Sequence, residues 1–331
     1  MTYLVAAEQL RPSREIVTAP YDPQPGESLA GFEPGDTVTT RDALYGLLVP
    51  SGNDAALTLA IAASGSESDF VARMNESAGD LGLSETAYTD PIGLDGGNVS
   101  SARDLVDLST ELREQSLFRE IVDTERFTLR SPAEPIRIES RNALVLSEPF
   151  IDGIKTGTTL AAGYVLVASG TRNGTGLVSV VLGSPDEGSR DAATLSLMDY
   201  GFSLYDERAL VKRGEKVGVA QLEGGGRLPL LARTNLKEVA RTDQKVTVNL
   251  PAIEPVERPV TEGDVLAVGV VKLDGERVGE VEAVASRDVA GLPESDEADS
   301  GLPTWAWIAF GGAAAVALLL GALAIRAYRD E

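Results

Sequence analysis

The sequence predicts an α+β domain, followed by a small β-rich domain and a C-terminal transmembrane helix. Three observations support this fold class. Within residues 1–204, apolar residues recur at helical spacing and three β-branched runs lie among the helical segments. Residues 206–289 contain short β-branched runs that alternate with Gly, Pro and Asp, a pattern typical of strands and turns. Residues 305–325 contain no charged side chain.

The composition excludes several classes of function. The 331 residues contain 29 Lys and Arg against 51 Asp and Glu, and a net charge of −22 argues against a nucleic-acid partner. The chain has no His and no Cys. Their absence excludes Ser-His-Asp triads, Cys-His dyads, His-ligated metals, disulfides and Fe–S clusters. Any catalysis must therefore depend on Ser, Thr, Lys, Arg, Tyr, Asp or Glu.

Helices are predicted in the first half of the α+β domain because apolar residues recur there every three or four positions. Pro50 and Gly52 interrupt the helical pattern, since neither residue continues a helix readily. Asp54 then begins the next helix as a favourable first-turn anion. The helices are predicted over residues 41–48, 54–63, 70–81 and 101–112.

The period changes in the second half of this domain, where strands are predicted over residues 150–158, 163–169 and 176–183. Asn173-Gly174 lies between the last two strands, and Asn-Gly is a strong signal for a tight hairpin turn. A last helix is predicted over residues 189–205. Helices before and after an antiparallel sheet indicate an α+β domain.

The C-terminal segment is predicted to cross a membrane. At about 1.5 Å per residue, its uncharged run is long enough for a hydrocarbon core of roughly 30 Å. Trp305 and Trp307 stand at one edge, and Arg326 and Arg329 follow the run, which places the C-terminus in the cytoplasm. The alternative is a buried core helix. The predicted segments are an acidic linker (290–303), a single-pass transmembrane helix (304–325) and a cytoplasmic tail (326–331).

Three polar clusters are candidates for chemistry, and each has an ordinary structural alternative. Ser51 and Asn53 lie in the forced break between two apolar helices, where they could instead cap a plain turn. Lys155 lies in a predicted strand, and because Lys is depleted in strands it is a candidate functional residue. The structural alternative is a lysine that protects an exposed strand edge from pairing. Arg190 lies in the first turn of the last helix, where the helix dipole disfavours a cation, so it is a candidate for binding an anionic ligand. The structural alternative is an ordinary surface arginine.

The order Ser-x-Asn then Lys-Thr-Gly, about a hundred residues apart, resembles the active-site signature of the penicillin-recognising serine enzymes. Residues 1–204 also resemble the D-alanyl-D-alanine carboxypeptidases, which are low-molecular-mass penicillin-binding proteins. The segments that carry this resemblance are GDTVTTRDALYGLLVPSGNDAALTLA, FVARMNESAGDLGL, DPIGLDGG, RNALVL and FIDGIKTGTTLAAGYVLVASGTRNG. The resemblance implies a β-lactamase/transpeptidase-like fold, and residues 206–289 are similar to the family's C-terminal domain.

The resemblance also implies an activity and residue roles. The family's serine enzymes remove the terminal D-alanine of peptidoglycan stem peptides, and β-lactams acylate them as substrate mimics. Ser51 would relay a proton to the departing D-alanine, Asn53 would hold the substrate backbone, and Lys155 would supply positive charge. No metal or organic cofactor is implied.

Further positions are implied in substrate binding. Thr156 and Arg190 would bind the terminal carboxylate, and the backbone N–H of Thr158 would form half of the oxyanion hole. The remaining positions are Lys155, Gly157, Arg141 and Asn142.

The sequence departs from the family at the nucleophile, which is the Ser of a Ser-x-x-Lys motif that precedes a Met-Thr pair. Met1-Thr2 resembles that pair, yet none of the lysines has a Ser three positions earlier. We expect the motif, a signal peptide and the first strands to be missing, and this chain to be inactive as given. The alternatives are a catalytically inactive, membrane-anchored peptidoglycan-binding protein and a β-lactamase of the same fold.

Overall fold

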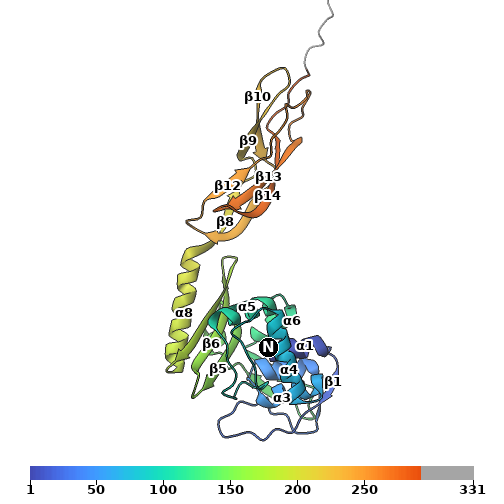
Figure 1. Cartoon of the computed structure of the whole chain (residues 1–331), viewed down its shortest axis with the longest axis vertical. Coiled ribbons are helices and arrows are strands. Elements are labelled where there is room, and N and C mark those ends of the chain that lie inside the picture. The colour runs from blue at the N-terminus through green and yellow to red at the C-terminus, as the bar shows by residue number, and fades with distance from the viewer. Residues whose placement is uncertain (292–331) are drawn as a thin grey trace, which may run out of the picture. The chain divides into compact units, whose positions relative to one another are not determined.

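The computed structural model describes residues 1–291, which belong to two compact units (Figure 1). The first unit comprises Met1–Leu210, Leu236–Thr247 and Leu273–Val278. The second comprises Val211–Asn235, Val248–Lys272 and the described residues from 279 onward.

Helices dominate the first part of the first unit. Thr39, Ser66 and Ser101 precede three of these helices, and each side chain accepts a hydrogen bond from the backbone amide three residues later. Such N-caps satisfy backbone donors that have no partner inside the helix. The helices are α1 (Thr2–Gln9), α2 (Thr40–Leu48), α3 (Asn53–Ser64), α4 (Glu67–Asp80), α5 (Ala102–Arg113), α6 (Ser116–Val122), α7 (Ala143–Ser147) and α8 (Glu187–Leu204).

The predicted helices correspond to α2, α3, α4, α5 and α8 with small shifts at their ends. The structure adds short elements that the sequence pattern did not predict. These are α6, α7 and two antiparallel two-stranded sheets. The strands of these sheets are β1 (Glu15–Val17), β2 (Thr37–Thr39), β3 (Arg126–Leu129) and β4 (Ile136–Glu139).

A three-stranded antiparallel sheet in the order β5-β6-β7 forms the second part of this unit. Asn173 and Gly174 connect β6 to β7 with φ angles of 50° and 82°. Positive φ at both positions matches the twist of a tight hairpin, as the Asn-Gly pair predicted. The strands are β5 (Ile151–Thr159), β6 (Gly163–Arg172) and β7 (Thr175–Ser184).

Helices cover both faces of this sheet (Figure 1): α8 lies on one face, and α5 and α6 lie on the other. Leu166 and Ala168 pack with Met198 of α8 in one buried cluster. Ile154 and Val167 instead belong to the larger core that the other helices form. Because side chains alternate along a strand, one sheet contributes to both clusters.

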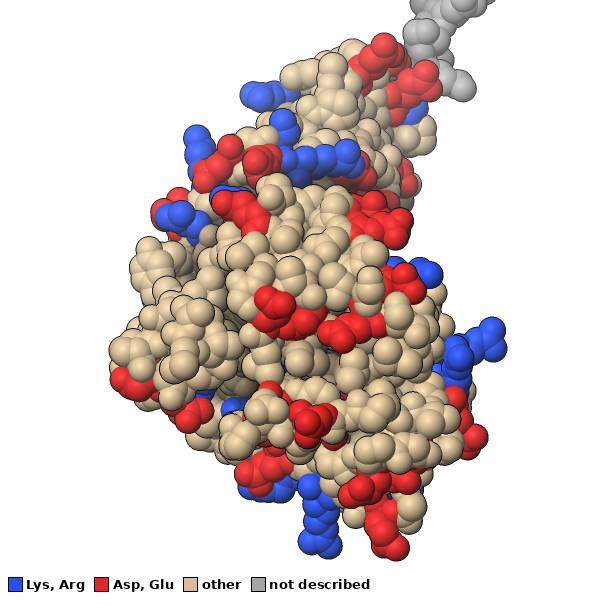
Figure 2. Space-filling view, turned by 60° about the horizontal axis from the view of Figure 1, so that its bottom comes forward, with Lys and Arg blue, Asp and Glu red and all other residues tan. Residues whose placement is uncertain are grey.

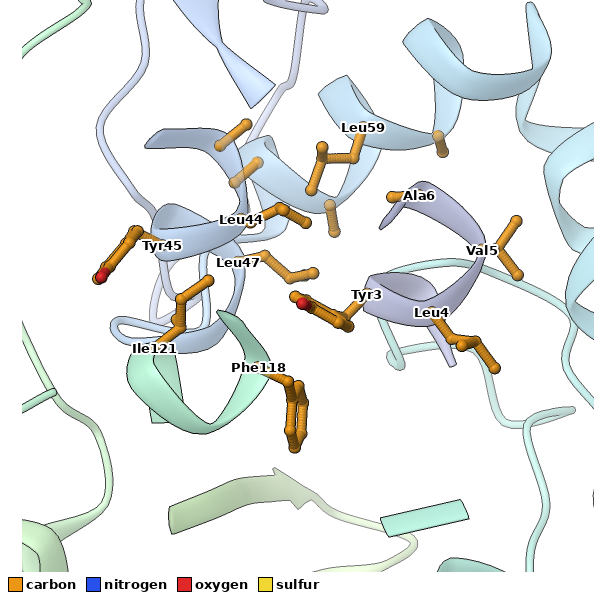
Figure 3. Close-up of a cluster of buried hydrophobic side chains, with 14 of the residues drawn as sticks. Tyr3, Leu4, Val5, Ala6, Leu44, Tyr45, Leu47, Leu59, Phe118 and Ile121 are labelled. Carbon is orange, nitrogen blue, oxygen red and sulfur yellow. The ribbon is translucent and has the colours of Figure 1, made fainter. Parts of the chain in front are cut away.

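The larger core lies among α1, α2, α3, α4 and α6, and Figure 3 shows part of it. Tyr3 and Phe118 are nearly fully buried and meet edge to face, with their ring centroids 5.0 Å apart. Leu44 and Leu59 are fully buried in the same cluster. This packing fixes the end of α2 and the start of α3, between which Ser51 lies.

The chain from residue 205 onward forms strands, with no helix among the described residues, as predicted for the small β domain. A five-stranded sheet has the order β12-β13-β14-β10-β9, and β11 pairs with β8. Leu228 and Leu230 on β10 are fully buried in two apolar clusters. The strands are β8 (Tyr205–Val211), β9 (Lys216–Gln221), β10 (Arg227–Ala232), β11 (Leu236–Arg241), β12 (Val246–Asn249), β13 (Val265–Leu273) and β14 (Glu276–Ala285).

The predicted transmembrane helix requires a correction. No helix within residues 1–291 is both long and apolar enough to cross a membrane. The longest described helix, α8, has 18 residues and carries charges such as Arg190 and Asp199, which hydrocarbon disfavours. The predicted span over 304–325 and the tail over 326–331 lie outside the described residues. We therefore correct the fold class to an α+β domain and a small β domain, and withdraw the predicted single-pass membrane localisation.

Candidate active site

A cavity of about 790 Å³ opens in the first unit. Its walls come from α1, the connection between α2 and α3, strand β5 and the first turn of α8. The structure thus brings together residues that are far apart in the sequence. The sequence-predicted site residues that line this cavity are Ser51, Asn53, Arg141, Lys155, Thr156, Gly157, Thr158 and Arg190.

Lys155 and Ser51 form a direct contact across this cavity. The Nζ atom of Lys155 donates a hydrogen bond to the Oγ atom of Ser51 at 2.6 Å. The same Nζ atom donates to the carbonyl oxygen of Thr156 at 2.8 Å. These bonds orient the ammonium group and leave the Ser51 hydroxyl free to donate its own proton elsewhere.

Ser51 has a strained backbone that the structure holds in place. Its φ of 61° lies in the left-handed region, which residues other than glycine rarely adopt. The next residue must be Gly52, because a Cβ there would lie 2.5 Å from the backbone nitrogen of Ala30 and 2.8 Å from the carbonyl oxygen of Gly46. The connection between α2 and α3 therefore accepts little change, which fixes the Ser51 hydroxyl relative to β5.

Asp54 fixes the other side of this connection. Its carboxylate is only 4% exposed and accepts hydrogen bonds from backbone amides on a neighbouring segment. These donors are the amides of Ala30 at 2.8 Å, Gly31 at 2.9 Å and Phe32 at 3.0 Å. The sequence suggested only a helix-start role for Asp54, whereas the structure shows that it also ties residues 30–32 to the start of α3. Asn53 precedes it and is held at the cavity wall.

Strand β5 presents the Lys-Thr-Gly segment at an edge of its sheet, because β5 pairs only with β6 within the β5-β6-β7 sheet. Thr156, Gly157 and Thr158 line the cavity. A Cβ at Gly157 would lie 2.9 Å from the Cγ2 atom of Val165, so a glycine is favoured there. An extended peptide could add to this strand edge through backbone hydrogen bonds.

The charge state of Lys155 depends on its surroundings. Burial and, as the smaller cause, the nearby charge of Arg141 together lower the pKa of Lys155 to about 8. Within the described residues Lys155 has no carboxylate within ion-pair distance. Lys155 is thus mostly protonated at neutral pH and can lose its proton slightly above it.

Arg190 reaches the cavity from the first turn of α8 and is only 2% exposed. Its Nη2 atom lies 3.0 Å from the Glu187 carboxylate and 2.8 Å from that of Asp191. The two carboxylates compensate the positive charge, which explains how a guanidinium can be buried at a helix start.

Arg141 and Asn142 are placed differently. Arg141 is exposed and lines the cavity. Asn142 is 5% exposed and does not line it. The Oδ1 atom of Asn142 accepts from the amide of Leu144 at 3.2 Å and its Nδ2 atom donates to the carbonyl of Gly153 at 3.3 Å. Asn142 therefore joins α7 to β5 and helps to hold β5 in position without facing the cavity.

The cavity contains charges of both signs. Arg141, Lys155 and Arg190 bring positive charge, whereas Glu27 and Glu187 bring negative charge. The face shown in Figure 2 carries many acidic side chains, in keeping with the net charge of −22. Positive charges in a cavity of such a protein attract an anionic group of a ligand.

Comparison with known families places this geometry in context. The family model of the D-alanyl-D-alanine carboxypeptidases matches residues 6–186, which is more than half of the chain. The chain belongs to this family. A second model, the C-terminal domain of penicillin-binding protein 5, matches residues 205–290.

Individual relatives of this D-alanyl-D-alanine carboxypeptidase family member agree with the assignment. D-alanyl-D-alanine carboxypeptidase DacF of Bacillus subtilis is 30% identical over 302 residues, which cover 87% of this chain and 77% of DacF. DacC of Escherichia coli is 36% identical over 194 residues, and the chain spans about half of DacC, 46%. The structure of penicillin-binding protein 5 from Haemophilus influenzae matches with a TM-score of 0.60 and 26% identity, covering 87% of this chain and 88% of that one.

Sequence reasoning missed several residues of this family member's cavity. The Glu27 carboxylate accepts a hydrogen bond from the Nδ2 atom of Asn53 at 3.3 Å and another from the hydroxyl of Tyr21. Burial and the Glu27 carboxylate raise the pKa of Tyr21 to about 12. Glu27 lies in a Pro- and Gly-rich segment without periodicity, so no sequence signal pointed to it. Glu187 was not predicted either, because the last helix was predicted to begin at residue 189, whereas α8 begins at Glu187 and places it three residues before Arg190.

Proposed function

We propose that this chain forms the substrate-binding site of a serine D-alanyl-D-alanine carboxypeptidase that trims the terminal D-alanine from peptidoglycan stem peptides. One observation carries the proposal. The hydrogen bond between Lys155 Nζ and Ser51 Oγ unites the Ser-x-Asn and Lys-Thr-Gly segments in one cavity. Arg190 lines the same cavity and provides a buried cation for a free carboxylate.

The substrate peptide binds as an added strand along the free edge of β5. Thr156 and Arg190 bind its terminal carboxylate, which selects peptides with a free C-terminus. The backbone N–H of Thr158 donates to the oxygen that becomes negatively charged during acyl transfer. The Asn53 side chain holds the peptide backbone, and Glu27 orients that amide.

The chemical step needs a nucleophile that attacks the carbonyl carbon between the two D-alanines. The family resemblance assigns it to the Ser of a Ser-x-x-Lys motif directly before a Met-Thr pair. Met1 and Thr2 line the cavity, so a motif placed before them would lie beside Ser51 and Lys155. The motif Lys takes the Ser proton, and the Ser51 hydroxyl delivers a proton to the nitrogen of the departing D-alanine. The acyl-enzyme is then hydrolysed by water.

Peptide titrations of the 331-residue chain test the binding part of this proposal. We expect an N-acylated peptide ending in D-Ala-D-Ala to bind and shift the amide resonances of Thr156 and Thr158 in an NMR spectrum. The same peptide ending in L-Ala-L-Ala is the control, since its methyl groups point differently along β5. Equal binding of both peptides, or shifts confined to residues outside the cavity, would contradict the proposal.

A second candidate is a peptide-binding protein without catalysis, because the Ser51–Lys155 contact and the buried Arg190 by themselves provide a site for a peptide with a free carboxylate. Under both candidates the 331-residue polypeptide alone forms no covalent penicillin adduct in a mass spectrum. The two differ once a Ser-x-x-Lys segment of a family member is fused before Met1. The carboxypeptidase then forms the adduct and releases D-alanine, and the binding protein does neither. A β-lactamase of the same fold would instead hydrolyse penicillin rapidly.

A further inference from the structure

Arg190 is already occupied by carboxylates of its own chain. The Oδ1 atom of Asp191 lies 2.9 Å from Nε and 2.8 Å from Nη2 of Arg190, so Asp191 covers the side edge of the guanidinium group. The Oε1 atom of Glu187 accepts a hydrogen bond from Nη2 at 3.0 Å. Nε thus donates to Asp191 and Nη2 donates to Glu187, while Asp191 also lies within ion-pair distance of Nη2.

A carboxylate binds arginine most strongly when both of its oxygens meet one edge of the guanidinium group. The side edge of Arg190 is closed by Asp191, which is 18% exposed and does not line the cavity. The end edge, formed by Nη1 and Nη2, remains, and its Nη2 atom already donates to Glu187. A ligand carboxylate in the cavity therefore meets Glu187 at the position it needs.

Glu187 is the carboxylate that can move. Its side chain is 59% exposed, it lines the cavity, and it contacts Arg190 through a single hydrogen bond and ion pair. It occupies the first residue of α8, where the helix dipole favours a negative charge with or without the ion pair. Rotating the Glu187 side chain into water therefore costs little more free energy than the loss of its contact with Arg190 Nη2.

We propose that Glu187 is an internal competitor for Arg190, which the C-terminal carboxylate of the substrate must displace. The inference rests on the proposed function, because it takes Arg190 as the carboxylate-binding residue. It makes Glu187 a specificity determinant. Ligands that carry a full carboxylate replace it, whereas amides and esters cannot offset the lost ion pair and leave Glu187 in place.

Two substitutions in the 331-residue chain separate competition from a general effect of charge. Glu187→Gln removes the negative charge, and Glu187→Asp keeps the charge but shortens the side chain so that it no longer reaches Nη2. Glu76→Gln is the matched control, since Glu76 is exposed on α4 and does not line the cavity. Each variant is titrated with an N-acylated D-Ala-D-Ala peptide and with its C-terminal carboxamide, and thermal melts verify folding.

We expect both Glu187 variants to bind the free acid about twofold to fivefold more tightly, the range for an ion pair with one exposed partner. Their affinity for the carboxamide and the affinities of Glu76→Gln stay unchanged. Unchanged affinity of both variants for the acid overturns the inference, and so does tighter binding by Glu187→Gln alone, which indicates long-range charge. If the unaltered chain binds acid and carboxamide equally, the role of Arg190 in the proposed function fails, and the competition fails with it.

Discussion

Strand β5 and the first turn of α8 each bring one cation to the same cavity, and the two cations are surrounded differently. Lys155 on β5 contacts a hydroxyl and a carbonyl, and within the described residues it has no carboxylate partner. Arg190 on α8 has two carboxylate partners, Glu187 and Asp191. Lys155 thus faces the cavity with its charge uncompensated, whereas the charge of Arg190 is shared with its own helix.

The chemistry of the two side chains explains this difference. A guanidinium group stays charged in proteins, so burying Arg190 requires carboxylates nearby. An ammonium group can lose its proton instead, and burial lowers the pKa of Lys155 to about 8. Arg190 on α8 is therefore suited to binding a carboxylate at any pH near neutrality. Lys155 on β5 is suited to the chemical step, in which a proton moves and negative charge develops on the substrate.

The largest expected effect comes from removing the uncompensated cation. In a chain with a family Ser-x-x-Lys segment before Met1, Lys155→Ala should slow acylation by both peptide and penicillin by roughly 30- to 5000-fold. Both ligands bring a carboxylate and pass through the same oxyanion, and the variant also frees the Ser51 hydroxyl from its partner. Stopped-flow acylation rates measure the loss. A loss below threefold would show that the charge on β5 is dispensable.

The two walls should also differ in which kinetic constant they control. In the same extended chain, Ser51→Ala should lower kcat by about a hundredfold, because a proton relay acts only while bonds change. Arg190→Ala should raise KM by about tenfold to a hundredfold with less effect on kcat, because carboxylate binding is similar in ground and transition states. Steady-state kinetics with a D-Ala-D-Ala peptide give both constants. A KM effect for Ser51→Ala together with a kcat effect for Arg190→Ala would contradict the roles assigned to these two residues.

The connection that carries Ser51 is held by hydrogen bonds from backbone amides to the Asp54 carboxylate, and these can be removed without changing Lys155 or Arg190. Asp54→Ala leaves the amides of residues 30–32, of which those of Ala30 and Phe32 are buried, without an acceptor. We expect a loss of about 2–4 kcal/mol in the free energy of unfolding of the first unit, measured by urea denaturation. Asp107→Ala, on the exposed face of α5, should change it by less than about 0.5 kcal/mol. Similar losses in both variants would refute a special role for Asp54.

Much of the framework around these walls was predictable from the sequence. The helix break at Pro50 predicted that Ser51 lies between two helices, and Asn173-Gly174 predicted the tight turn that connects β6 to β7. The short elements α6 and α7 were not predicted, because 7 and 5 residues are too few to establish a helical period. The transmembrane helix was predicted from an uncharged run and the Trp and Arg residues that flank it, and no helix within residues 1–291 can cross a membrane.

The side chains of the site were only partly predictable. Ser51, Lys155 and Arg190 came from motifs and their order along the chain, and the structure places all three at one cavity. Glu27 could not be found, since its contact with Asn53 depends on how an irregular segment folds over α3. The ion pair between Arg190 and Glu187 was not predicted, because the predicted helix began at residue 189 and left Glu187 outside it. The burial of Arg190, which makes such a pair matter, is also visible only in the fold.

The smallest expected effect concerns pH, and it separates the two cations most directly. Because the pKa of Lys155 is lowered to about 8, its positive charge is present below that pH and is lost as the pH rises through it. The peptide carboxylate stays charged over the same range. Affinity of the 331-residue chain for a D-Ala-D-Ala peptide should therefore fall by about twofold to fivefold between about pH 7 and pH 9.5. Lys155→Arg keeps its charge throughout, so its affinity should stay level in the same titrations. A parallel fall in Lys155→Arg would assign the pH dependence to another group and remove the proposed contrast between the walls.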